Sequence, residues 1–406
     1  MNNESNKLKC LSLFSGCGGM DLGALGGFVF QEKEYSRLNT SIVFANDIDC
    51  DAVTCYNSNS LLVNEENEKA VLGDIRDIPP SSLPDFDILL AGFPCQPFSN
   101  AGNRKGVNDN GGRGVLFEVC ENVLREKVLN GKSKPKAFVF ENVRGILSSK
   151  MPNGITVPDE IRNRMEKLGF SVSQQLICAS DYGVPQQRYR VLIIGIYNPN
   201  NDKRKKFNFS CLEELVKSEN IPSSVFGGKE KLVLGSILKD IEIPGEYLEY
   251  SKGTQYMIEK IGSCKHGKNG IEFFKNNIPL DEMPTEIFEG RSWKNIPPEM
   301  LPPRFKRIYD QPKKYHAPKF YRRFAYGEIN GTITASAQPE NCGITHPVEN
   351  RRFSVKEIAR IQSFPDSFDF SKIPLQSRYK VIGNAVPPVL SWCIFKTLTD
   401  FLQGDK

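Results

Sequence analysis

Residues 8–23 read LKCLSLFSGCGGMDLG, an apolar run that passes directly into a glycine-rich turn. The run predicts a strand over Leu8–Phe14. The glycines of the turn let the backbone bend sharply and approach a ligand where a Cβ would clash. The dinucleotide fingerprint G-x-G-x-x-G is excluded, because Asp21 stands where its last glycine would be. A tight surface turn remains the alternative for this stretch taken alone.

Two carboxylates follow the next short apolar runs. Asp47 ends the strand expected at Ser41–Asn46, and an acid in this place can accept hydrogen bonds from both hydroxyls of a ribose. Asp74 lies in a later Gly-Asp-Ile sequence and could accept a hydrogen bond from an adenine amino group. The glycine turn and Asp47 together predict a nucleoside site.

The first 196 residues alternate short apolar runs with helical or glycine-rich stretches, which is the pattern of a doubly wound α/β sheet. Further strands are expected at Asp87–Ala91, Ala137–Glu141, Val172–Ala179 and Arg190–Tyr197, and helices at Glu118–Leu129 and Glu160–Leu168. Ser354–Phe364 and Val386–Leu402 return to a helical pattern. The last of these helices is expected to pack back on the first domain.

From about residue 198 to 345 proline, glycine, lysine and aromatic residues increase and apolar periodicity weakens. The sequence thus predicts a catalytic domain of residues 1–196 plus 374–406 and a smaller, loop-rich domain of residues 197–373, with its variable part at about 197–345. Residues 197–330 hold 23 Lys+Arg against 18 Asp+Glu, whereas the rest of the chain is neutral. Basic and aromatic residues alternate over 303–323, as suits a nucleic-acid backbone, although a solvated loop would have the same composition.

A cysteine lies between two prolines just after the strand expected at Asp87–Ala91, in the sequence Gly92-Phe-Pro-Cys-Gln-Pro97. The prolines stiffen the loop and hold the Cys95 thiol at the carboxyl edge of the sheet, where open α/β sheets bind ligands. A free thiol is partly ionised at neutral pH and is nucleophilic. Residues 99–114 are rich in glycine, asparagine and charge, which is typical of a lid or of a disordered loop.

An acid lies at the end of one further expected strand, and two arginines lie at the start of another. If the strands ending at Ala91 and Glu141 are neighbours, Glu141 and Cys95 emerge side by side, because parallel strands lie about 4.8 Å apart. Arg188 and Arg190 are two residues apart on an extended segment, so both are expected to face this edge. A surface ion pair is the alternative for the arginines.

Several classes of protein are excluded by composition. The chain of 406 residues is 39% hydrophobic and 25% charged, as in globular proteins, and it has no apolar run long enough to cross a membrane. The polar N-terminus lacks a secretory signal, so a cytoplasmic protein is expected. The 11 cysteines form no C-x-x-C pair and there are 3 histidines, so no metal site is predicted and most thiols are expected to be buried in a reducing compartment.

The order of these motifs closely resembles the DNA (cytosine-5) methyltransferase family. The resemblance rests on Phe14-Ser-Gly-Cys-Gly-Gly19, Pro94-Cys-Gln96, Glu141-Asn-Val143, Gln187-Arg-Tyr-Arg190, Arg360-Ile-Gln-Ser-Phe-Pro365 and Gly383-Asn-Ala-Val-Pro387, and covers about residues 8 to 402. It implies a Rossmann-like α/β domain that binds S-adenosylmethionine and a smaller target-recognition domain. A bacterial modification methylase would act as a monomer on double-stranded DNA, with or without a cognate restriction endonuclease.

The resemblance also implies roles for individual residues. Phe14 would lie by the adenine, Asp47 would hold the ribose, Asp74 would meet the adenine amino group, and Leu116 and Asn384 would lie near the methionine portion. Ile48 stands where members often have a larger aromatic residue, so adenine packing would be thinner here. The whole expected cofactor set is Phe14, Ser15, Gly16, Gly18, Gly19, Asp47, Ile48, Asp74, Ile75, Pro94, Leu116, Asn384 and Ala385.

The implied reaction begins on a cytosine that has left the base stack. Cys95 would add to C6, Glu141 would stabilise N3, Arg190 would bind the ring carbonyl and orient Glu141, and Arg188 would hold a phosphate of the extruded nucleotide. Three alternatives remain from the sequence: an RNA cytosine methyltransferase, whose Cys-Phe-Thr element is absent from 197–345, a catalytically silent cofactor-responsive DNA-binding protein, and a nicotinamide oxidoreductase, which Asp21 disfavours.

Overall fold

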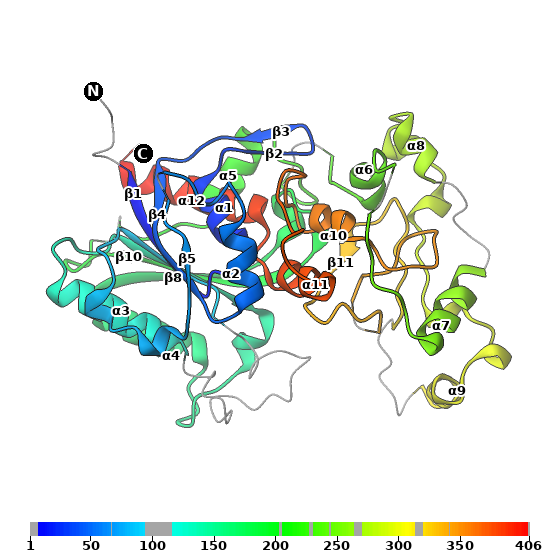
Figure 1. The fold of residues 1–406 in the computed structure, drawn as a ribbon, viewed down its shortest axis with the longest axis horizontal. Helices are drawn as coiled ribbons and strands as arrows, with labels where there is room; N and C mark the ends of the chain where they lie inside the picture. The colour runs from blue at the N-terminus through cyan, green and yellow to red at the C-terminus, as the bar shows by residue number, and fades with distance from the viewer. Residues whose placement is uncertain are drawn as a thin grey trace.

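The computed structural model describes residues 7–65, 67–93, 116–202, 205–226, 230–242, 245–263, 270–312, 320–340 and 342–404. A seven-stranded sheet with flanking helices forms one side of the molecule, and a helical, loop-rich part forms the other (Figure 1). The first strand, β1, and the last helix, α12, both lie on the sheet side (Figure 1). The strands are β1 (Leu8–Leu13), β2 (Phe28–Phe30), β3 (Lys33–Tyr35), β4 (Thr40–Asp47), β5 (Ala70–Leu72), β6 (Ile88–Ala91), β7 (Ala137–Val143), β8 (Phe170–Cys178), β9 (Gln186–Gln187), β10 (Tyr189–Tyr197) and β11 (Asn330–Gly331).

The central sheet has the order β5-β4-β1-β6-β7-β10-β8. Neighbouring strands from β5 to β7 are parallel, and β10 runs antiparallel to both β7 and β8. From β1 the sheet grows in one direction through β4 and β5, and then in the other direction through β6 and β7. Where the strand order changes direction, a crevice opens at the carboxyl ends of the strands, and sheets of this kind bind ligands there. The fold is therefore the predicted Rossmann-like α/β architecture, with one antiparallel strand added.

Helices cover both faces of the sheet, because successive strand residues point to opposite sides. Cys10, Ile88 and Val139 share one buried cluster with α1 and α12, whereas Leu11, Leu89 and Phe138 share another with α3 and α4. The helices are α1 (Gly19–Leu25), α2 (Cys50–Asn57), α3 (Leu116–Asn130), α4 (Val157–Lys167), α5 (Ser210–Ser218), α6 (Leu234–Leu238), α7 (Lys252–Ser263), α8 (Ile271–Lys275), α9 (Pro303–Asp310), α10 (Val355–Ile361), α11 (Leu375–Asn384) and α12 (Pro388–Gln403).

The C-terminal helix α12 packs on the first helix α1. The Ser391 hydroxyl donates to the carbonyl of Met20 at 2.6 Å, and the Trp392 indole donates to the carbonyl of Ser36 at 2.9 Å. The segment Leu375–Gln403 is long and apolar enough to cross a membrane by length and composition, but 83% of its most apolar window is buried inside the protein. Burial of this kind is what a core helix shows.

The second part of the molecule is joined to the first by a shared core. The cluster around α1 and α12 continues through Leu234 of α6, Ile333 and Phe353. A separate cluster around Ile258 and Trp293 lies further out, among α7 and α9. Between Tyr197 and Asn330 the described residues form helices and short 3-10 turns connected by loops.

Candidate active site

The ends of β6 and β7 lie side by side at the edge where Glu141 leaves the sheet. These strands pair in parallel with Ala91 opposite Phe140, so Gly92 and Glu141 leave the sheet side by side. A Cβ on Gly92 would lie 3.7 Å from Oε2 of Glu141, and the Asn142 side chain donates to the carbonyl of Phe93 at 3.3 Å. The chain leading to Cys95 is thereby held beside the Glu141 carboxylate.

Cys95 and Pro94 lie outside the described residues, as does the segment 99–114 that was expected to form a lid. The strand adjacency on which the pairing of Cys95 with Glu141 depended is present. The position of the thiol itself stays a prediction.

Glu141 and Arg190 form a charge pair at this edge. The Arg190 Nε lies 2.5 Å from Oε1 of Glu141, and both side chains are 11% exposed. The antiparallel register of β7 and β10 places Arg190 opposite Val143, two residues beyond Glu141 on the same face. The pair fixes the orientation of the carboxyl group and leaves Oε2 directed at the Gly92 side, as the role expected for Arg190 requires.

Arg188 does not face the same edge, and the prediction that it holds a phosphate is wrong in this structure. Its side chain is buried, 1% exposed. The guanidinium donates to three backbone carbonyls: those of Ile333 at 2.9 Å, Gly383 at 3.0 Å and Ala385 at 3.0 Å. The spacing argument failed because β9 ends at Gln187 and β10 begins at Tyr189, so Arg188 lies in a break between strands.

The glycine-rich turn forms a cradle at the end of β1. Gly16 has φ +56°, and a Cβ added there would meet no atom within 4 Å, so its backbone faces open space. A Cβ on Gly19 would lie 2.4 Å from the carbonyl of Val386, so only glycine allows α1 to begin against that segment. The Ser15 hydroxyl is buried, and no described group forms a hydrogen bond with it. Open backbone and an unsatisfied hydroxyl suit a polar ligand.

Phe14 and Gly18 complete the turn. Phe14 has φ +58° and packs partly buried against the cluster that contains Ile75 and Leu116. Gly18 has φ +88° and caps the N-terminus of α1. Phe14, expected by the adenine, and Leu116, expected near the methionine portion, thus belong to one apolar cluster, in which Ile75 and Leu116 are buried.

Asp47 ties the end of β4 to the turn. Its Oδ2 accepts a hydrogen bond from the Gly16 amide at 2.8 Å, and its Oδ1 accepts one from the Asp49 amide at 2.9 Å. Each oxygen keeps a second lone pair for a ligand hydroxyl. Burial raises the pKa of Asp47 above its usual value, and these amide hydrogen bonds oppose the rise. Ile48, beside it, is 67% exposed, which leaves an apolar surface for a ligand to cover.

Asp74 is already engaged within the protein. Its Oδ1 accepts from the backbone amide of Arg76 at 2.9 Å and from the Arg76 Nε at 3.0 Å. The Arg76 hydrogen bond lowers the pKa of Asp74 below its usual value. An adenine amino group would have to share this carboxylate with Arg76, so the role expected for Asp74 stays a prediction.

Asn384 and Ala385 lie at the C-terminus of α11, against the start of α1. Asn384 is exposed and Ala385 is buried, with its Cβ 3.1 Å from where a Cβ on Gly19 would be. A buried amide network holds this end of the helix: Gln362 donates to the carbonyl of Ala385 at 2.5 Å, and Gln186 donates to Oε1 of Gln362 at 2.6 Å. Both glutamines lie in motifs of the sequence, but no role was predicted for either, because they meet only in the folded chain.

The basic segment 303–323 is partly internal. Arg323 is buried and donates to the carbonyl of Glu349 at 2.9 Å and to Oδ1 of Asn350 at 2.8 Å, while Arg322 pairs with Glu328. Residues 313–319 lie outside the described residues.

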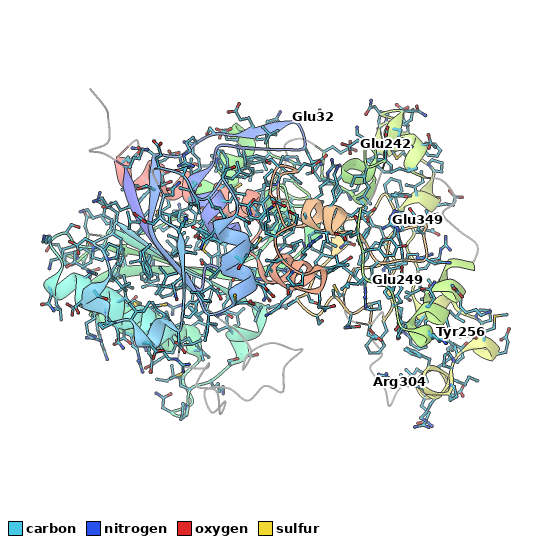
Figure 2. All side chains as sticks on the ribbon, in the orientation of Figure 1. Glu32, Glu242, Glu249, Tyr256, Arg304 and Glu349 are labelled. Atoms are coloured by element: carbon cyan, nitrogen blue, oxygen red, sulfur yellow. The ribbon has the colours of Figure 1, made fainter. Side chains whose placement is uncertain are left out.

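Arg304 and Arg307 are exposed on α9, and within the described ranges no carboxylate pairs with either of them. Figure 2 labels Arg304 on α9 and Tyr256 on α7, both in the helical part of the molecule. Among the described residues of 303–323, the exposed arginines of the predicted basic surface are therefore those on α9.

Comparison with known proteins agrees with this geometry. Residues 8–400 match the family described as C-5 cytosine-specific DNA methylase. The Type II methyltransferase M.FnuDI of Fusobacterium nucleatum is 32% identical over 403 residues, covering 97% of this chain and 96% of the relative. M.NgoFVII of Neisseria gonorrhoeae is also 32% identical, over 393 residues, covering 96% and 85%. These matches support DNA modification and not the RNA, silent or nicotinamide alternatives.

A solved structure shows the same fold. The crystal structure of the S. pombe Dnmt2 methyltransferase superposes with a TM-score of 0.56 at 17% identity, covering 97% of this chain and 98% of that one. The family match covers nearly the whole chain, and the Glu141–Arg190 pair lies at the edge where β6 leads to Cys95. The chain belongs to the C-5 cytosine-specific DNA methylase family and is a DNA (cytosine-5)-methyltransferase.

Proposed function

We propose that this enzyme methylates C5 of a cytosine extruded from double-stranded DNA, with Cys95 as nucleophile and Glu141 as the group that stabilises the ring. The observation that carries the assignment is the Glu141–Arg190 pair, whose free carboxylate oxygen faces Gly92, directly after the strand that leads to Cys95. C5 of cytosine is a poor nucleophile, so adding the Cys95 thiolate to C6 is needed to put electron density on C5. Glu141 at N3 accommodates the charge that develops on the ring.

The remaining steps restore the base. C5 takes the methyl group, a base then removes the C5 proton, and the Cys95 sulfur leaves C6 with its bonding electrons, which returns the aromatic ring and the thiolate. Arg190 holds Glu141 in place through the 2.5 Å contact. Its Nη1 donates to the carbonyl of Tyr189 at 2.8 Å, so Nη2 is the group that would reach the ring carbonyl. Extrusion of the base is required because neither C6 nor C5 is accessible within the stack.

The methyl donor proposed for this site is S-adenosylmethionine, which supplies an electrophilic methyl group when bound. The fit rests on the buried Ser15 hydroxyl, the open backbone at Gly16 and the lone pairs that remain on Asp47. Ile48, Asp74 and Asn384 would complete the contacts. Pro94, Phe14, Gly18, Gly19, Ile75, Leu116 and Ala385 would shape the site.

Trapping with a modified substrate tests the covalent step. DNA with 5-fluorocytosine at the target cannot release a C5 proton, so it should accumulate a methylated adduct that resists SDS and maps to Cys95, only when the methyl donor is present. Cys95→Ala should form no adduct. Cys50→Ala is the matched control, since Cys50 is the exposed cysteine of the described set, and it should trap at the wild-type rate. An adduct on another cysteine, or methylation without any adduct, would refute the assignment.

Glu141→Gln tests the ring-stabilising role. Adduct formation should slow by about 10²–10⁴-fold, the usual size of a general-acid contribution, since the N3 contact acts on the addition itself. Wild-type trapping rates in this variant would show that Glu141 is structural.

We further propose that the enzyme acts as a cytoplasmic monomer and that its relatives' Type II context extends to it, with a cognate restriction endonuclease acting on the same DNA sequence. Methylation mapping of plasmid DNA from an expressing strain would identify the modified site. Resistance of that DNA to an endonuclease encoded nearby would support the pairing, and a mass measurement by light scattering would test the monomer.

A further inference from the structure

Because Arg188 is buried on backbone carbonyls, the phosphate contact expected of it needs another residue. Arg144 directly follows β7 and begins a short 3-10 helix, Arg144–Ser148. It is exposed, and no carboxylate among the described residues pairs with it. Its guanidinium carbon lies 5.8 Å from the centre of the Tyr189 ring, which is 46% exposed. An exposed cation without a carboxylate partner is free to meet an anion.

The strand register places this pair next to the catalytic pair. The register of β7 and β10 ends with Arg190 opposite Val143; Arg144 follows Val143 and Tyr189 precedes Arg190. Their side chains therefore leave the sheet at the same edge as Glu141 and Arg190, but from its other face. Arg144 follows Glu141 by three residues, which is about 10 Å along an extended chain. A base held at Glu141 would bring its sugar and phosphates to this edge of the sheet, where Arg144 is exposed.

The chemistry of the pair suits a phosphate. A guanidinium offers two parallel N–H donors that match two phosphate oxygens, and it keeps its charge at any working pH. The Tyr189 ring restricts the guanidinium by a cation–π contact without neutralising it, as a carboxylate would. The nearby Arg190 is already paired with Glu141, so its charge is largely compensated.

We propose that Arg144, held by Tyr189, binds a backbone phosphate flanking the extruded cytosine. The proposal rests on the proposed extrusion of the base toward Glu141. It assigns to Arg144 a substrate contact in place of the one expected of Arg188, and it makes Tyr189 a positioning residue.

Neutral phosphate substitution provides the test. Duplexes that carry a single methylphosphonate at each position near the target cytosine are bound to the enzyme in the presence of S-adenosylhomocysteine. Wild-type enzyme should lose about 10-fold in affinity at one flanking position, and Arg144→Gln should lose about as much on unmodified DNA. In the variant, the methylphosphonate at that position should have no further effect. The slope of log Kd against log salt should become shallower by about 0.9, the value for one phosphate contact.

Two variants control for charge and shape. Arg125→Gln removes the same charge from the half-exposed Arg125 on α3 and should keep the wild-type slope and methylphosphonate pattern. Arg144→Lys keeps the charge and should retain most of the salt dependence while losing part of the affinity. If no methylphosphonate position loses its effect in Arg144→Gln, the proposal is overturned. Since binding is measured without methyl transfer, this result is distinct from a failure of the Cys95 trapping experiment.

Discussion

Arg188→Met should destabilise the fold and weaken the cofactor site together, while leaving the Glu141–Arg190 pair intact. Methionine keeps an apolar stem of similar length but has no donors for the carbonyls that Arg188 now serves. The carbonyl of Ala385 retains the Gln362 amide at 2.5 Å. The carbonyls of Ile333 and Gly383 accept hydrogen bonds from the Arg188 guanidinium at 2.9 Å and 3.0 Å, and the variant loses both.

The magnitude follows from those two carbonyls. A helical partner for Gly383 would be the amide of residue 387, which is a proline and has none. Leaving a buried acceptor unsatisfied costs about 1–3 kcal/mol, so the two together predict a loss of about 2–6 kcal/mol in the free energy of unfolding. Stabilities of folded proteins are about 5–15 kcal/mol, so the loss should be easily measured. Arg188→Lys can reach one carbonyl and should lose less.

Urea unfolding followed by circular dichroism gives the stability change, and calorimetry with S-adenosylhomocysteine gives the change at the cofactor site. Affinity should fall because Gly383 and Ala385 flank Asn384. Arg125→Met provides the comparison, since Arg125 is half-exposed and bonded only to Glu121 among the described residues, and it should stay within about 0.5 kcal/mol of wild type. If Arg188→Met unfolds at the wild-type urea concentration, the reasoning about buried carbonyls is refuted.

Three further outcomes are expected. Asp47→Ala should weaken S-adenosylmethionine by about 1–3 kcal/mol in calorimetry, and unchanged affinity would remove Asp47 from the site. Burial lowers the pKa of His346 to about 4, and two backbone amides donate to its Nδ1. In the unfolded chain His346 therefore takes up a proton below about pH 6.5, whereas in the folded chain it stays neutral down to about pH 4. The free energy of unfolding should fall by up to about 3 kcal/mol between pH 6.5 and 4. The fall should be smaller in His346→Gln. Replacing Arg304 and Arg307 with glutamine should reduce the salt slope of DNA binding by about 1–2 without changing cofactor affinity, and an unchanged slope would exclude the α9 face from the DNA surface.

Much of the sheet could be predicted because its strands are buried on both faces and bounded by turn residues. The strand expected at Leu8–Phe14 is β1, Leu8–Leu13, and the strand expected at Arg190–Tyr197 is β10, Tyr189–Tyr197. The β2–β3 hairpin was missed, since its turn residues Gln31 and Glu32 both adopt positive φ without the glycine or asparagine that usually marks such a turn.

The sequence by itself determined which chemical groups follow the strands, because parallel strands deliver their C-terminal residues to one edge whatever the loops between them do. This is why Asp47, Glu141 and the glycine turn could be assigned to a single site. Only the tertiary structure decided which arginine pairs with Glu141. Arg188 turns inward because carbonyls from residues 333, 383 and 385, remote in sequence, meet around it and need donors, whereas Arg190 meets Glu141 through the register of two strands. Local spacing carries no information about such distant acceptors.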